Sequence, residues 1–181
     1  TPDAVRRFML AWTEDTNVWP DDRMFHAAWM TRPAYRQLVL ARLRMILLAV
    51  EPHVRSDRAE DISYVESALT VEHLLPQTWQ SHYPLPDDGS VDEAQREILL
   101  HTLGNLALLT SKLNSSVSNG RWSTAEDISE DRGKRAAILK HSGLAVSRMV
   151  VDYRVWDDAA IKKRGEALFK AALKVWPKPE A

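Results

Sequence analysis

The chain has 181 residues, an apolar fraction of 45% and a formal net charge of −1, which suits one domain with a substantial core. It contains no cysteine, so neither a disulfide framework nor a thiolate zinc site can form. Its near-neutral balance is not that of a free-standing nucleic-acid-binding protein, although basic residues exceed acidic ones in residues 101–181. The chain begins with Thr1 and shows no signal peptide, so we expect a fragment of a longer, cytoplasmic protein.

The first part of the chain is predicted to be helical. Apolar residues recur at helical spacing in residues 3–12 and again after Asp21–Asp22, which can cap a second helix. Residues 34–50 are apolar over much of their circumference, so we expect a central buried helix there, too short and too charged to span a membrane. Residues 62–69 suit a helix or a strand, and a short helix is favoured.

The rest of the chain is predicted to place two short strands among further helices. The expected strands cover residues 70–73 and 106–110, and a surface loop rich in Pro and Gly covers residues 77–90. The expected helices cover residues 91–100, 111–117, 130–141 and 157–175, while residues 145–153 suit either state. The predicted fold class is therefore mainly α (α+β).

Polar residues suited to metal and acid–base chemistry stand beside the two strands. Glu72 and His73 close the first strand, Asn105 precedes the second, and Asn114 lies in the short helix that follows. Carboxylate and amide oxygens bind hard cations and an imidazole can activate water, so this order suits metal-assisted phosphodiester cleavage. Because neighbours on a strand point to opposite faces, Glu72 and His73 could serve one phosphate only if the strand ends or twists there.

The same residues carry a family resemblance. The pattern Glu-His-x-x-Pro-Gln from Glu72, then Leu-Gly-Asn-Leu-x-Leu-Leu from Leu103, then Asn114 nine residues after Asn105, resembles an HNH (ββα-metal) nuclease. More narrowly, it resembles the HNH-type domain at the C-terminal end of GmrSD-type modification-dependent restriction enzymes and related phage-defence nickases. Residues near the C-terminal end are spaced like the last helix of that family, namely Trp156, Asp158, Ile161, Arg164, Leu168, Ala172, Trp176 and Pro177.

The resemblance implies a helical domain that carries a small ββα-metal HNH motif. Residues 1–69 would be a helical part packing on the nuclease core, residues 70–122 the motif, and residues 123–181 the C-terminal helices of the same domain.

The resemblance also implies roles for four residues. His73 would be the general base, Asn105 would pin the loop that holds the histidine, and Glu72 and Asn114 would hold Mg²⁺ or Mn²⁺. Each residue has an ordinary alternative as a core histidine, a turn residue, an exposed strand residue or a surface residue of a helix.

Other candidates are less specific. Asn119 could belong to the metal site or cap a turn, and His101 could touch a phosphate or cap the end of a helix. The basic residues that could bind the DNA backbone, or simply form a solvated face, are Lys112, Arg121, Arg132, Lys134 and Arg135.

The sequence thus predicts a divalent-metal-dependent DNA endonuclease of the nicking kind, acting on double-stranded phage DNA in restriction or anti-phage defence. The resemblance implies a missing N-terminal nucleotide-hydrolysing domain of the same protein, and no membrane contact is expected. Two alternatives stay open: a non-catalytic DNA-binding module, and a helical protein-interaction domain, which the seven tryptophans would suit.

Overall fold

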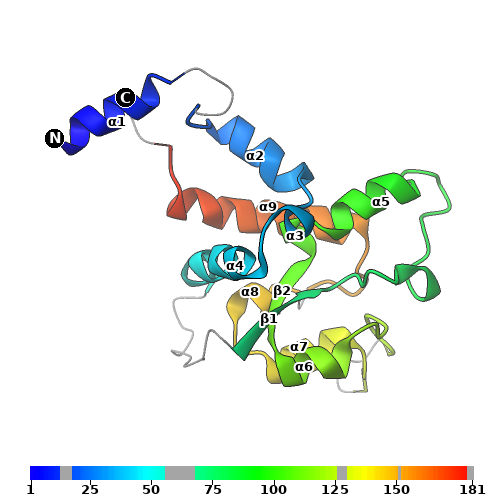
Figure 1. Ribbon diagram of the computed structural model, residues 1–181. Helices are drawn as coiled ribbons and strands as arrows, with labels where there is room; N and C mark the ends of the chain where they lie inside the picture. The colour runs from blue at the N-terminus through cyan, green and yellow to red at the C-terminus, as the bar shows by residue number, and fades with distance from the viewer. Residues whose placement is uncertain (13–17, 56–67, 126–129, 151, 179–181) are drawn as a thin grey trace.

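The computed structural model describes residues 1–12, 18–55, 68–125, 130–150 and 152–178. In this part of the chain, helices surround a two-stranded antiparallel sheet (Figure 1). This pair of strands is called the hairpin below, although a long connection that contains a helix joins them. In chain order the elements are α1 (Pro2–Leu10), α2 (Asp22–Thr31), α3 (Ala34–Gln37), α4 (Leu40–Val54), β1 (Leu69–His73), η2 (Trp79–Ser81), α5 (Glu93–Leu100), η3 (Leu103–Asn105), β2 (Leu106–Thr110), α6 (Ser111–Val117), α7 (Lys134–His141), α8 (Ala145–Arg148) and α9 (Asp158–Val175).

The hairpin and the helix after it form the expected ββα unit. β1 pairs with β2 from Leu69 opposite Thr110 to His73 opposite Leu106. α6 begins at the residue after β2, and the Thr110 side chain caps it by accepting a hydrogen bond from the Leu113 amide. The predicted mainly α (α+β) fold class is therefore confirmed.

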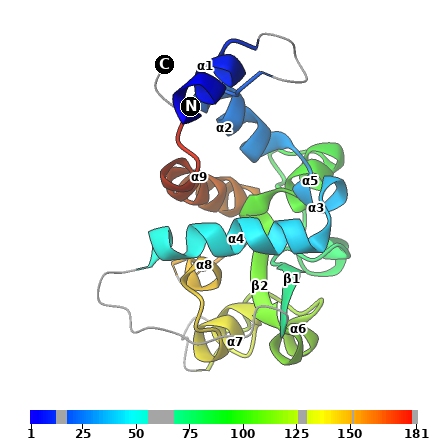
Figure 2. The same ribbon diagram turned by 60° about the vertical axis from the view of Figure 1, so that its left-hand side comes forward.

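β2 separates two hydrophobic cores because its alternate side chains face opposite ways. Leu106 and Leu108 belong to a core shared with α4 and α9, whereas Ala107 and Leu109 belong to a core shared with α5, α6 and α7. Figures 1 and 2 show α4 and α9 on one side of the hairpin and α6 and α7 on the other. A strand buried on both faces explains why residues 106–109 read as a continuous apolar run.

α9 fixes the turn that leads into β2. A Cβ atom on Gly104 would lie 2.4 Å from the Ile161 carbonyl oxygen, so only glycine permits this approach. The fully buried Arg164 donates to the Gly104 carbonyl at 2.7 Å and to the Val146 carbonyl at 2.8 Å. The long C-terminal helix thereby locks η3 in place.

The expected helix over residues 34–50 is divided. The chain is extended at Leu38, which separates α3 from α4, and the Tyr35 amide donates to the His101 carbonyl at 3.0 Å. α4 continues to Val54, past Pro52, and its Glu51 carboxylate accepts hydrogen bonds from the first amides of α8. α4 buries Leu43, Leu47 and Val50 in the core, as expected of a central helix, whereas Leu40 and Met45 on its other side are exposed.

Several boundaries also differ from expectation. α7 begins at Lys134 rather than Glu130, because the Asp131 carboxylate accepts hydrogen bonds from the Thr124 and Gly133 amides and closes a loop there. Residues 145–153 contain the short helix α8, and Leu69 already belongs to β1, whereas residues 62–67 lie outside the described part. No helix in the described residues is long and apolar enough to cross a membrane.

Candidate active site

Asn105 clamps the segment that follows β1. The side chain is fully buried, and its Oδ1 accepts from the Leu75 amide at 2.8 Å and from the Trp156 indole at 3.0 Å. Its Nδ2 donates to the carbonyls of Leu75 and Leu100, both at 2.9 Å. All four hydrogen-bonding positions of the amide are thus used, and two of them hold the Leu75 backbone, two residues after His73.

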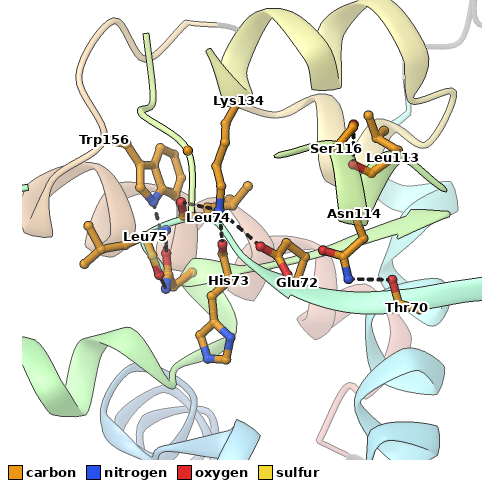
Figure 3. Close-up of polar contacts among 12 residues, drawn as sticks. Thr70, Glu72, His73, Leu74, Leu75, Leu113, Asn114, Ser116, Lys134 and Trp156 are labelled. Carbon is orange, nitrogen blue, oxygen red and sulfur yellow. Dashed lines mark hydrogen bonds and ion pairs between the residues drawn. The ribbon is translucent and has the colours of Figure 1, made fainter. Parts of the chain in front are cut away.

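The pleat of β1 sends its last two side chains in opposite directions. Glu72 points toward α6 and α7, whereas His73 points toward α3 and the end of α5 (Figure 3). β1 ends at His73. An end of the strand at this point is one of the two conditions under which the sequence analysis allowed Glu72 and His73 to serve one phosphate. The structure therefore places the two residues side by side along the chain but on separate faces of the hairpin.

On the first face, Glu72 pairs with a buried lysine. The Lys134 ammonium lies 3.1 Å from Glu72 Oε1, 2.8 Å from the His73 carbonyl and 3.4 Å from the Leu74 carbonyl. Burial raises the pKa of Glu72 and lowers the pKa of Lys134, and the attraction between the two groups opposes both shifts. Lys134 was a candidate for the DNA backbone, yet its side chain is 1% exposed and holds this carboxylate instead.

Asn114 lies on the same face as Glu72. Its Nδ2 donates to Thr70 Oγ1 at 3.1 Å, which leaves Oδ1 directed toward the Glu72 side (Figure 3). Thr70 precedes Glu72 by two residues, so the two share a face of β1. The structure thus places Glu72 and Asn114, the two expected metal-binding residues, on the same face of β1.

The donor set on this face suits a hydrated divalent cation. One carboxylate and one amide oxygen match the hard oxygen ligands of Mg²⁺, which keeps several waters and binds phosphate oxygens. The Lys134 ammonium already binds Glu72 Oε1 and two main-chain carbonyls, so a divalent cation would have to share Glu72 with this ammonium or displace it. Among the described residues, no group of three or more His, Cys, Asp or Glu side chains is placed to hold a metal ion.

On the second face, His73 is enclosed by aromatic rings. It is 4% exposed, its Nε2 lies 3.2 Å from His101 Nδ1, and the Tyr35 ring meets it edge-on at 4.3 Å between centroids. Burial first, and then the charges of His101, Lys134 and Arg36, lower the His73 pKa to about 3. The imidazole is therefore neutral at pH 7, the form that can accept a proton.

The remaining candidates occupy different positions. His101 is the C-cap residue of α5. It is 1% exposed and its side chain contacts His73, so it is not available at the protein surface. Asn119 lies exposed in the turn after α6, as its turn-residue alternative predicted. Of the other basic candidates, Lys112, Arg121 and Arg132 are exposed and Arg135 is half-buried.

Sequence reasoning missed several partners of these residues. Tyr35 comes from α3, Lys134 from the start of α7 and Trp156 from the segment before α9. The spacing of the motif contains no signal for residues that lie outside it. The segment before α7 positions Lys134 through the Asp131 loop, because the Lys134 amide also donates to the Arg121 carbonyl at 2.9 Å.

Comparison with known proteins identifies the family. Residues 19–171 match the family described as GmrSD restriction endonucleases, C-terminal domain. Searches of curated proteins and of solved structures found no significant match. The matched region covers well over half of the chain and includes the hairpin, the Asn105 clamp and both faces described above. The chain therefore belongs to the family of GmrSD restriction endonuclease C-terminal domains, the HNH-type nuclease family that its motif resembles.

Proposed function

We propose that this domain is a divalent-metal-dependent DNA endonuclease that cuts one strand at a time. Membership of the family indicates a nuclease of the restriction-endonuclease type. In the proposed reaction, His73 takes a proton from water as the water oxygen bonds to phosphorus and the bond to the leaving oxygen breaks. The observation that carries the proposal is the position of His73 at the end of β1, directly before the backbone that the Asn105 clamp holds.

Because Glu72 and His73 point to opposite faces of β1, the proposed mechanism requires the phosphate to bind at the end of the strand, just beyond His73. In an in-line displacement at phosphorus, the attacking and leaving oxygens lie on opposite sides of the phosphate. At the strand end, the base would act on the attacking water and the cation on the phosphate oxygens. Glu72 and Asn114 would hold Mg²⁺ or Mn²⁺, which would supply positive charge to stabilise the phosphate oxygens.

The proposed substrate and biological setting follow from the family. We infer double-stranded DNA as the substrate, phage DNA as the natural target, and a nucleotide-hydrolysing N-terminal domain of the same protein as the partner that selects it. The net charge of −1 implies few phosphate contacts by this domain alone, so its own DNA binding is expected to be weak.

A plasmid time course tests the proposed activity. With Mg²⁺ or Mn²⁺, the domain should convert supercoiled plasmid to open circles first, because one base and one small metal site hydrolyse one strand per binding event. EDTA should stop the reaction, and rising salt should slow it, since each phosphate contact contributes about −0.9 to the slope of log K against log salt. Linear DNA without an open-circle intermediate at limiting enzyme would contradict single-strand cutting. A retarded but intact plasmid would favour the DNA-binding module.

Replacement of Asn114 tests the proposed cation site. Asn114→Ala should raise the metal concentration needed for half-maximal cleavage by about tenfold, because removing one of two protein oxygens weakens a water-rich site. Its melting temperature should change little, since Asn114 is half-buried and makes one side-chain hydrogen bond to Thr70. The exposed Asn119→Ala is the matched control and should leave the metal titration unchanged. Superimposable titrations for both variants would remove Asn114 from the site.

A further inference from the structure

A polar chain leads from the surface of the domain to His73. Arg36 on α3 forms an ion pair with the Glu97 carboxylate on α5. Glu97 Oε1 lies 3.5 Å from His101 Nε2, and His101 Nδ1 lies 3.2 Å from His73 Nε2. The two imidazole planes are nearly perpendicular, and Tyr35 packs against both rings. The chain passes from an exposed carboxylate to an enclosed imidazole through one intervening histidine.

The order of these groups determines where the protons lie. At 3.5 Å the Glu97 carboxylate makes no hydrogen bond to the buried His101 Nε2, but its negative charge still attracts a hydrogen on this nitrogen and repels a lone pair there, so the hydrogen lies on Nε2. A neutral His101 with its hydrogen on Nε2 has a bare lone pair on Nδ1. That lone pair accepts the hydrogen of His73 Nε2 across the 3.2 Å contact. The unprotonated nitrogen of His73 is then Nδ1.

We propose that Glu97 and His101 are positioning residues that hold His73 as its Nε2–H tautomer and so make Nδ1 the proton acceptor. This inference rests on the proposed function, because it assigns the atom of His73 that takes the proton from water. Neither residue touches the phosphate in this arrangement. Their contribution is to keep the lone pair on one nitrogen and the ring at one angle.

The surrounding charges fit a neutral histidine pair. Two cations face it: Arg36 from α3 and the Lys134 ammonium from α7, bound to the His73 carbonyl. The only carboxylate described against the pair is Glu97, which lies on the His101 side. The negative charge therefore acts on the outer ring, where it selects the tautomer, and leaves the inner ring uncharged.

Nitrogen NMR of the imidazoles reads the tautomer directly. In ¹⁵N-labelled protein at neutral pH, two-bond proton–nitrogen correlations distinguish a protonated ring nitrogen from a bare one. We expect His73 and His101 both to show a protonated Nε2 and a bare Nδ1. His26 on α2 is the matched control, because its Nε2 lies 2.8 Å from Glu166 Oε1 on α9 in another histidine–carboxylate pair. The His26 signals are identified by their loss in His26→Asn.

Two substitutions of His101 separate positioning from packing. In His101→Asn, the amide oxygen can occupy the place of Nδ1 and accept from His73 Nε2, so the tautomer and the cleavage rate should be kept. His101→Leu fills space but accepts nothing, so His73 should populate both tautomers and cleavage should slow by about 10–100-fold, the usual effect of losing a partner that orients a functional imidazole. In the His101→Asn background, Glu97→Leu should have no further effect on the rate.

The outcomes distinguish this inference from the proposed function. A protonated Nδ1 on His73 in the parent protein, or a folded His101→Leu protein with the parental tautomer, would overturn the positioning role whatever the nuclease assay shows. A His101→Asn protein as slow as His101→Leu, with equal melting temperatures, would also overturn it. A domain with the expected tautomers that fails to cut DNA with any divalent metal would instead contradict the proposed function.

Discussion

His73→Ala abolishes DNA cleavage in our proposal, with a fall in rate of about 10²–10⁴, because the reaction loses its general base. The imidazole is neutral at pH 7 and stands at the end of β1, beside the face that carries Glu72 and Asn114. Initial rates of plasmid nicking with saturating Mg²⁺ measure the effect. DNA binding, followed by fluorescence anisotropy with a labelled duplex in the presence of Ca²⁺, should change little.

The variant must be compared with one that removes a histidine elsewhere. His26→Ala deletes a half-exposed imidazole paired with Glu166, so it should keep the parental rate. His73 is buried against His101 and Tyr35, so some loss of melting temperature accompanies His73→Ala, and circular dichroism must show that it remains folded at the assay temperature. A folded His73→Ala protein that cuts at the parental rate would refute the assignment of the base.

Asn105→Ala should give the largest loss of stability among the site variants. It would leave four buried groups without their partner: the Leu75 amide and carbonyl, the Leu100 carbonyl and the Trp156 indole. An unpaired buried polar group costs about 1–3 kcal/mol, and allowing for relaxation we expect the free energy of unfolding to fall by about 3–4 kcal/mol in total. Urea denaturation followed by tryptophan fluorescence measures the change.

The same substitution should also reduce cleavage, because the loop after His73 would no longer be held. Asn119→Ala removes an exposed amide from the turn after α6 and is the control, with an expected change in unfolding free energy within about 0.5 kcal/mol. If Asn105→Ala unfolds at the same urea concentration as Asn119→Ala, the Asn105 amide does not clamp the loop.

The sequence by itself determined the ββα unit at the centre of the domain. Residues 70–73 and 106–110 carried local signals of short strands, and the helix over residues 111–117 was expected directly after the second strand. The resemblance also implied that Asn105 pins the loop that holds the histidine, and in the structure its amide holds the Leu75 backbone. These features depend on neighbours within a few residues, so pattern and resemblance were sufficient.

Helix boundaries away from the motif were determined less well, because long-range contacts set them. The helix expected over residues 34–50 is broken at Leu38 where Tyr35 binds the His101 carbonyl, and α4 extends to Val54 where Glu51 caps α8. An apolar run cannot distinguish one buried face from burial on all sides, since that depends on how many elements pack around it.

Only the tertiary structure decided how the two faces of the site are built. Lys134 reaches Glu72 across 62 positions of the chain, and His101 meets His73 across 28. A lysine beside an arginine in a charged helix looks like a solvated surface residue, and burial of its ammonium follows only from the Asp131 loop that starts α7. Such pairings are absent from local patterns, because desolvation and complementary charge act between side chains that meet only after the helices have packed.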